Sequence, residues 1–331
     1  MQETDDSTDP EGTLCRQFAM LLASPPSAEP VAADPASRQM LSLAARAARS
    51  SATILVTGPS GAGKDVIARH LHALSPRAAR PFLALNCAAL PDAMLESLLF
   101  GHERGAFTGA LSAAPGLFRA AGAGTLFLDE VGELPLPLQA KLLRAIEARE
   151  VLPLGATAPV PFEARLIAAT NRDLAADAAA GRFREDLYWR LCVFPLVLAP
   201  LAERPADILP LAARLLHGAD VRLSGRALRR LLGHGWPGNV RELANRLERA
   251  RILAGDGPLT DAHLDLPAAP ASPPLPGLLR RHEADVLSRA LAEAGGRRVE
   301  AARRLGISER TLRYKLAAQA GRPRSAPAIR A

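Results

Sequence analysis

The chain has 331 residues, 48% of them hydrophobic and 23% charged, a composition typical of a globular protein with two or three domains. No apolar run approaches the roughly 20 residues of a membrane-spanning helix, and the acidic first residues are unlike a signal peptide. The three cysteines are scattered and odd in number, which argues against structural disulfides or a zinc site. Together these features predict a cytoplasmic protein with no membrane partner.

The net charge of +7 is unevenly placed along the chain. From residue 278 to the end there are 13 Arg and Lys residues against 5 Asp and Glu residues, a balance of +8, so the remainder carries −1. A compact basic module on a neutral body predicts a nucleic-acid-binding element. The alternative from composition alone is a basic face that contacts only solvent.

Residues 1–30 form a short N-terminal segment, too short for a sensory domain. In residues 31–200, short apolar stretches alternate with helical patterns. We expect strands at 52–57, 81–86, 125–128 and 164–170, helices at 37–49, 64–74 and 138–148, and a hairpin at 150–160. This alternation predicts an α/β domain with a largely parallel sheet and helices on both faces.

A phosphate-binding loop is predicted between the first strand and the helix that follows it. The sequence fits G-x-x-x-x-G-K, whose glycines let backbone N–H groups close around phosphate oxygens at a helix N-terminus. Lys64 would reach the outer phosphates. The residues assigned to nucleotide binding here are Gly58, Pro59, Ser60, Gly61, Ala62, Gly63, Lys64 and Asp65. Asp65 replaces the usual Ser or Thr that contacts Mg²⁺, so the choice of metal-holding groups stays open.

Two carboxylates, Asp129 and Glu130, follow the apolar strand at 125–128. At the carboxyl end of a strand beside a phosphate loop, such a pair faces the bound phosphates. Asp129 would orient Mg²⁺ and Glu130 would polarise the attacking water, which makes ATP and Mg²⁺ the predicted cofactors. An exposed acidic strand end is the alternative, and the upstream phosphate loop disfavours it.

Residues 105–110 read Gly-Ala-Phe-Thr-Gly-Ala. They are too rich in glycine for a helix interior and too poor in apolar side chains for a core strand. We expect a mobile loop that presents Phe107 to a partner. A surface turn with one buried aromatic is the alternative.

The rest of the chain is expected to be helical, apart from a linker and a tail. We assign a helical lid to 201–266, a Pro-rich linker to 267–277, a small helix-turn-helix domain to 278–320 and a basic disordered tail to 321–331. Gly306 would make the turn between its two central helices. The residues left to contact double-stranded DNA are Ser308, Arg310, Thr311, Arg313, Tyr314 and Lys315. A plain three-helix bundle with a basic face is the alternative.

The loop matches, letter for letter, the GAFTGA loop of bacterial enhancer-binding proteins, the AAA+ ATPases that activate sigma-54 RNA polymerase. From residue 31 to residue 266 every motif resembles that family in the family's order, and 278–320 resembles its Fis-type DNA-binding domain. The resemblance implies an α/β AAA+ P-loop NTPase with a parallel sheet and helical lid, plus a small all-α helix-turn-helix domain. The implied sigma-54 contacts are Gly105, Ala106, Phe107, Thr108, Gly109 and Ala110.

The resemblance also implies roles around the nucleotide. Asn86 matches the switch asparagine proposed to hold the catalytic glutamate until ATP is in place, and Asn171 matches sensor I, which reads the γ-phosphate. Arg184 and Arg190 stand at arginine-finger positions, where a finger completes the site of the neighbouring copy. Arg241, in the lid, matches sensor II. The implied catalytic set is Lys64, Asn86, Asp129, Glu130, Asn171, Arg184 and Arg190.

The predicted function is an ATP-dependent transcription activator that binds upstream DNA, assembles from inactive dimers into a hexameric ring, and remodels sigma-54 RNA polymerase. Because no receiver domain precedes residue 31, we expect control by a protein acting in trans, by expression level or not at all, rather than by phosphorylation. Two alternatives stay open. One is an AAA+ remodeller of another protein, which the GAFTGA loop disfavours; the other is a DNA-binding repressor with a decayed ATPase, which the intact catalytic set disfavours.

Overall fold

The structure, a computed structural model, describes residues 10–24 and 29–266. Within this part, no helix is long and apolar enough to cross a membrane. The predicted linker (267–277), the helix-turn-helix domain (278–320) and the basic tail (321–331) lie outside the described residues. So do the six predicted DNA contacts, Ser308, Arg310, Thr311, Arg313, Tyr314 and Lys315.

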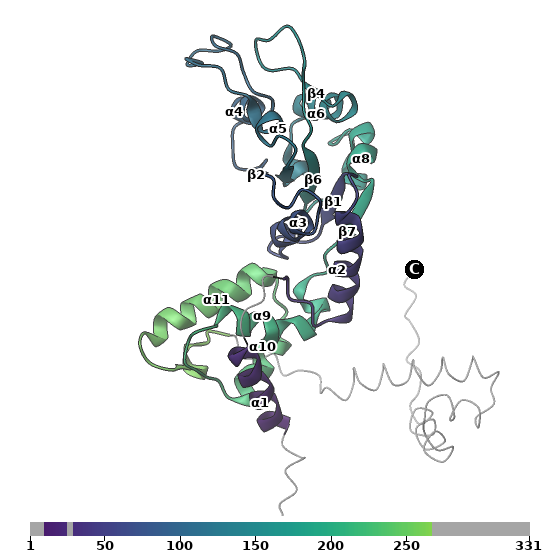
Figure 1. The fold of residues 1–331 in the computed structure, drawn as a ribbon. Coiled ribbons are helices and arrows are strands. Elements are labelled where there is room, and N and C mark those ends of the chain that lie inside the picture. Colours follow the sequence, from purple (N-terminus) through teal and green to yellow (C-terminus); the bar gives the residue numbers. More distant parts are fainter. Residues whose placement is uncertain (1–9, 25–28, 267–331) are drawn as a thin grey trace, which may run out of the picture. The chain divides into compact units, whose positions relative to one another are not determined.

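The α/β part is built on a sheet of parallel strands in the order β2–β3–β6–β1–β7 (Figure 1). These are β1 (Ile54–Thr57), β2 (Phe82–Asn86), β3 (Thr125–Asp129), β6 (Arg165–Thr170) and β7 (Phe194–Val197). The predicted parallel sheet is therefore confirmed. β7 is a further strand, which we do not predict from the sequence. It contains Pro195, which lacks a backbone N–H. An edge strand tolerates proline because one side of its backbone has no neighbouring strand to hydrogen-bond.

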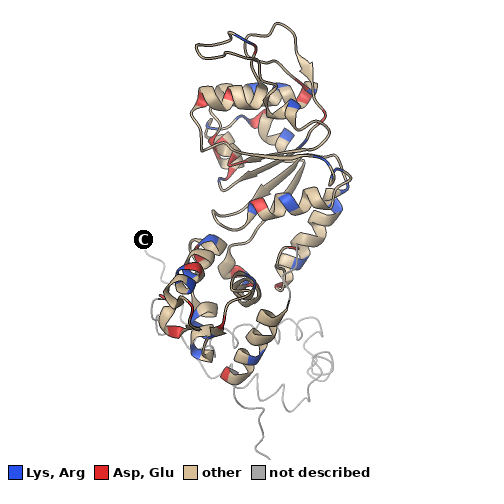
Figure 2. Cartoon of the chain, turned by 60° about the vertical axis from the view of Figure 1, so that its left-hand side comes forward, with Lys and Arg blue, Asp and Glu red and all other residues tan. Residues whose placement is uncertain are grey.

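Alternating residues of the strands point into two apolar layers. On β3, Leu126 and Leu128 enter one layer and Phe127 enters the other, as the two-residue period of a strand requires. The strands are nearly free of charged residues (Figure 2), which fits a sheet covered on both faces. One layer contains α2 (Pro35–Ala48) and α3 (Lys64–Ala73); the other contains α4 (Asp92–Phe100), α5 (Gly116–Ala120), α6 (Leu136–Ala148), α7 (Leu174–Ala179) and α8 (Glu185–Leu191).

The helical lid has an apolar core of its own. Trp236 is buried in it, and its indole N–H donates to the Leu231 carbonyl at 2.9 Å. The lid helices are α9 (Ile208–Leu215), α10 (Gly225–Gly233) and α11 (Asn239–Ala254). The expectation of an entirely helical lid is wrong in one detail: β8 (Val221–Arg222) and β9 (Leu259–Thr260) form a short parallel pair.

Smaller elements complete the described chain. The predicted hairpin at 150–160 is confirmed as β4 (Glu150–Val151) paired antiparallel with β5 (Val160–Pro161). Short 3-10 helices occur at η1 (Val131–Glu133), η2 (Leu201–Glu203), η3 (Pro205–Asp207) and η4 (Asp261–His263).

The N-terminal segment forms a helix, α1 (Pro10–Ala23), that packs on the lid. Phe18 is only 3% exposed and belongs to the lid core. Cys15 and Glu11 add polar contacts, from the Cys15 thiol to the Leu223 carbonyl and from the Glu11 carboxylate to Arg229. We predict no element in this segment from the sequence, whereas in the structure it is part of the lid.

Replacing Phe18 with alanine is expected to lower the free energy of unfolding of the lid by about 3–5 kcal/mol, because it removes a buried aromatic side chain and leaves a cavity. Met20→Ala, on the same helix but 72% exposed, should change it by less than about 0.5 kcal/mol. Urea denaturation of both variants checks this. Equal, small losses for the two substitutions would mean that α1 does not pack on the lid.

Candidate functional site

The phosphate loop joins the end of β1 to the start of α3. Gly61 and Gly63 have φ angles of +74° and +102°, which glycine adopts without the strain that other residues meet. A Cβ atom on Gly61 would lie 2.5 Å from the Gly238 carbonyl oxygen, so this glycine also lets the lid approach the loop. The N-cap of α3 is Gly63, which brings no acceptor side chain to the first N–H groups of the helix. Those groups can bind an anion such as phosphate.

Lys64 and Glu130 form an ion pair at the carboxyl edge of the sheet. Lys64 is 6% exposed, and its Nζ lies 3.4 Å from Glu130 Oε1 and donates to the Gly58 carbonyl at 3.1 Å. A buried ammonium group needs such partners, and phosphate oxygens could replace them. Glu130 has a φ of +52°, a strained conformation for a residue with a side chain. Strain of this kind concentrates at functional sites.

Asp129 lies beside this pair. Burial raises the pKa of the Asp129 carboxyl, the negative charge of Glu130 raises it further, and the positive charge of Lys64 opposes both effects. The negative charge of Asp65 raises the same pKa to a smaller extent. A divalent cation would favour the ionised form of Asp129, and carboxylate oxygens suit Mg²⁺. Among the described residues, no three or more candidate metal ligands lie together.

The two predicted asparagines lie at strand ends on the same edge of the sheet. The backbone N–H of Asn171 donates to Glu130 Oε2 at 3.1 Å, so Lys64 and Asn171 each hold one oxygen of the carboxylate. Asn86 is paired with Asp129 in the β2–β3 register. Its side-chain oxygen accepts from the N–H of Ala88 at 2.8 Å. In this state the contacts that hold the Glu130 carboxylate therefore come from Lys64 and Asn171.

The lid reaches the phosphate loop through the start of α11. Arg241 donates from its backbone N–H to the Gly61 carbonyl at 3.3 Å and from its guanidinium to the Ser60 hydroxyl at 3.1 Å. The amide of Asn239, a buried residue, donates to the Ser60 carbonyl at 3.0 Å and accepts from the N–H of Leu201 at 2.8 Å. Asn239 is a site residue that we do not predict from the sequence, although it lies two residues before Arg241.

A second residue missing from the predicted site is Arg204. Its guanidinium donates to the Ala62 carbonyl at 2.7 Å and lies 3.8 Å from Asp207, which is fully buried. Asp207 accepts from the backbone N–H of Asp34 at 2.7 Å and from the Ser37 hydroxyl. This chain of contacts joins the phosphate loop, the start of the lid and the beginning of α2.

An apolar cavity of about 200 Å³ opens beside the phosphate loop. Val31 and Leu41 come from the segment before the sheet, Ile67 from α3, and Leu215 and Val240 from the lid. The phosphate loop contributes its last glycine to the lining, so the cavity adjoins the phosphate-binding backbone. A flat apolar base attached to phosphates in the loop could enter this cavity.

The two predicted finger arginines are exposed on α8 and its N-cap. The Arg184 guanidinium pairs with Asp186 at 2.7 Å, and Arg190 pairs with Glu147 of α6 at 3.2 Å. Buried Gln139 accepts from the backbone N–H of Arg184 at 2.8 Å and so fixes its position. Both ion-pair partners lie outside the phosphate loop, and the exposed guanidinium groups are accessible to another molecule.

Residues 105–110 form the tip of a loop between α4 and α5. Its base is held by two backbone hydrogen bonds between His102 and Ala114. Phe107 is 43% exposed and packs edge-on against the His102 imidazole, with ring centroids 5.0 Å apart. Thr108 is exposed. A second loop is joined to this one because the N–H of Glu103 donates to the Leu154 carbonyl at 2.9 Å.

Comparison with protein families identifies three matches. The model described as "Sigma-54 interaction domain" matches residues 31–197, "AAA+ ATPase lid domain" matches 202–274, and "Bacterial regulatory protein, Fis family" matches 278–318. The first covers the sheet, the phosphate loop and the GAFTGA sequence. The predicted fold class, an AAA+ P-loop NTPase with a helical lid and a Fis-type helix-turn-helix domain, is confirmed.

Similar proteins carry related names. "Response regulator protein FleR" of Pseudomonas aeruginosa is 52% identical, over 87% of this chain and 69% of its own length. "Sigma54-dependent transcriptional activator SfnR" of Pseudomonas putida is 48% identical, over 68% of this chain and 63% of its own length. Crystal structures of NtrX from Brucella abortus with ADP and with ATP align with TM-scores of 0.65 and identities of 31% and 32%, over 92% of this chain and 72% of theirs.

Proposed function

The chain belongs to the family of sigma-54-dependent transcriptional activators with an AAA+ ATPase and a Fis-type DNA-binding domain, and from this premise we propose that it couples ATP hydrolysis to remodelling of sigma-54 RNA polymerase through residues 105–110. It would do so as a ring, most simply a hexamer assembled from inactive dimers. The 278–320 domain would hold the ring on upstream double-stranded DNA, in the cytoplasm. A regulatory protein acting in trans would set when the ring forms.

One observation carries this proposal: the loop is inserted between two of the strands that end at the nucleotide site. β2 ends at Asn86 and β3 at Asp129, and these residues are paired in register. α4, the loop and α5 lie between those strands in the chain. A change at the strand ends on ATP binding or hydrolysis could therefore reach Phe107 and Thr108 through α4 and α5.

The nucleotide would bind with its phosphates on loop 58–63 and its adenine in the apolar cavity lined by Val31 and Val240. The solved complexes of NtrX with ATP and ADP, a protein 31–32% identical, support the binding of ATP. Asp129 and Asp65 would hold Mg²⁺ together with phosphate oxygens, and the metal would offset the charge that develops on the phosphates.

The catalytic step would depend on releasing Glu130. When the phosphates of the nucleotide bind the Lys64 ammonium group, Glu130 Oε1 would lose its ion-pair partner. The carboxylate could then accept a proton from water. Arg184 and Arg190 are exposed and lie on α8 or its N-cap, which suits a role in the site of an adjacent copy. The Arg241 guanidinium would leave the Ser60 hydroxyl and bind a phosphate oxygen, which would couple nucleotide binding to the lid.

The experiment that tests the proposed function measures promoter opening on supercoiled templates. With ATP, the full-length protein should give open complexes with sigma-54 polymerase on a template that contains its binding site, and none with sigma-70 polymerase. Without ATP, both reactions should stay closed. Brisk ATP hydrolysis with no opening of any sigma-54 promoter would favour a remodeller of another protein.

A further inference from the structure

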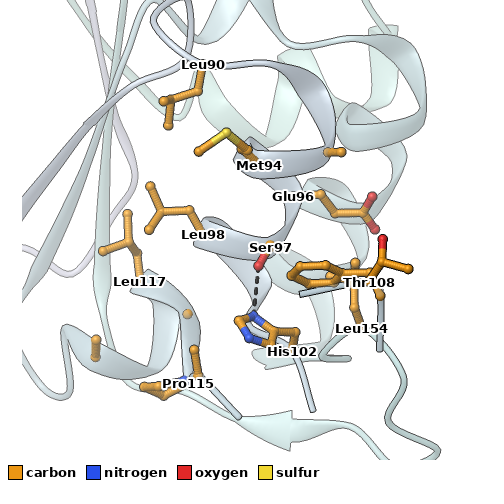
Figure 3. Close-up of a pocket in the computed structure, with 15 residues that line it drawn as sticks. Leu90, Met94, Glu96, Ser97, Leu98, His102, Thr108, Pro115, Leu117 and Leu154 are labelled. Carbon is orange, nitrogen blue, oxygen red and sulfur yellow. Dashed lines mark hydrogen bonds between the residues drawn. The ribbon is translucent and has the colours of Figure 1, made fainter. Parts of the chain in front are cut away.

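An apolar groove of about 790 Å³ lies between α4, α5 and the base of the GAFTGA loop. Leu90, Met94 and Leu98 line one side of it, and Leu117 faces them from α5, while His102 lies at the end nearest the loop (Figure 3). Met94 is 59% and Leu98 is 41% exposed to water. A continuous apolar surface of this kind marks a site of contact with another molecule.

Three of the polar side chains that line the groove already have partners. Glu96 pairs with Lys141, the Ser97 hydroxyl lies 2.8 Å from His102 Nδ1, and His102 Nε2 lies 3.0 Å from the Ser112 carbonyl. The groove therefore offers an occupant apolar surface, with the exposed Thr108 side chain at its rim. Aliphatic side chains fit that chemistry, and charged or strongly polar groups do not.

The length of the groove suggests the form of the occupant. α4 has nine residues, so it spans about 13 Å at 1.5 Å per residue. This length accommodates about two turns of a partner helix that presents aliphatic side chains at i, i+3 or i+4, and i+7. An amphipathic helix laid along α4 would bury these side chains and keep its polar face in water.

The GAFTGA loop identifies the partner that would supply this helix. Phe107 and Thr108 line the groove as well as belonging to the loop, and Phe107 is held there by its contact with His102. The backbone pairing of His102 with Ala114 fixes the base of the loop at the same end. A molecule that contacts the loop tip from this side therefore also meets the groove.

We propose that the α4–α5 groove binds an amphipathic helix of sigma-54, so that the protein holds its target with the groove while the loop tip moves. The proposal rests on the proposed function, because it takes sigma-54 as the partner of the loop. It adds a second contact surface, formed by Met94, Leu98 and Leu117, whose recognition is apolar and independent of the Thr108 hydroxyl.

The test uses full-length protein carrying Glu130→Gln, which should keep ATP bound, and measures the Kd for sigma-54 in the presence of ATP. Adding Met94→Glu or Leu98→Glu should weaken binding at least tenfold, because a carboxylate would have to enter an apolar groove. In the otherwise wild-type chain, the same substitutions should leave ATP hydrolysis unchanged. Leu136→Glu, on α6 and similarly exposed, is the matched control and should change neither measurement.

A photo-crosslinking amino acid at position 98 identifies the occupant directly. A crosslink to sigma-54 supports the proposal, and a crosslink only to a second copy of this chain overturns it. If sigma-54 binds the Glu130→Gln protein equally well with and without the two glutamate substitutions, the groove is not its site although the proposed function stands. If sigma-54 does not bind the Glu130→Gln protein with ATP, the proposed function itself fails.

Discussion

Glu130→Gln is expected to lower the rate of ATP hydrolysis at least 100-fold while leaving ATP affinity nearly unchanged. The amide keeps the size of the side chain but cannot accept a proton from the attacking water, and general-base catalysis contributes about 10²–10⁴-fold. Affinity should persist because Lys64 and loop 58–63 are intact, and because the neutral amide no longer competes as an anion for Lys64. Single-turnover hydrolysis and nucleotide titration measure the two effects separately.

The control for this substitution is Glu133→Gln. Glu133 lies in η1, three residues further along the chain, and pairs with Arg172 at the surface at 3.4 Å. Removing the Glu133 carboxylate should change the rate of ATP hydrolysis less than about twofold, since an exposed ion pair contributes little to stability. Equal rates for the Glu130 variant and the wild-type chain would contradict the assignment of Glu130 as the base.

Arg184→Ala is expected to reduce hydrolysis by roughly 10³-fold or more, the effect typical of losing an arginine finger. An arginine finger acts on the site of the adjacent copy, so mixing the Arg184→Ala protein with a second variant that keeps Arg184 should restore part of the activity. Lys64→Ala chains, inactive in their own site, still carry an intact Arg184. Random mixing of the two inactive variants should restore up to roughly a quarter of the wild-type rate, because about one interface in four then pairs an intact site with an intact finger.

Arg144→Ala is the control for a lost surface charge. Arg144 is an exposed arginine on α6, the helix that packs beside α8, and its removal should leave hydrolysis within about twofold of wild type. A mixture of the Arg184 and Lys64 variants with no more activity than either alone would count against a finger supplied in trans. The same mixing experiment with Arg190→Ala separates the two arginines.

The sequence predicts the parts of the fold that depend on local patterns. Buried strands such as 164–170 consist mostly of apolar residues, and the motifs at their ends follow from the geometry of a parallel sheet. The Lys64–Glu130 ion pair forms because the phosphate loop and the acidic pair both follow strands that end at the same edge of the sheet. These features need no knowledge of distant contacts.

The parts that the sequence does not predict depend on tertiary contacts. Phe18 belongs to a short apolar stretch that becomes a buried helix face only because α9 and α10, nearly 200 residues later, cover it. Arg204 resembles any surface arginine until Ala62 and Asp207 surround it. The α4–α5 groove likewise depends on residues distant in the sequence, since Leu90, Leu117 and Leu154 all line it. Periodicity and motif spacing carry no signal for such contacts.

The most direct test of the central claim compares wild type with Thr108→Ala in ATP-dependent open-complex formation by sigma-54 polymerase. Thr108 is exposed at the loop tip. Ser112→Ala, lower in the same loop, is the matched control. We expect all three proteins to hydrolyse ATP at similar rates, with wild type and Ser112→Ala opening the promoter and Thr108→Ala losing at least about 90% of open complexes, a tenfold effect. Promoter opening by Thr108→Ala at the wild-type rate would contradict coupling through this loop.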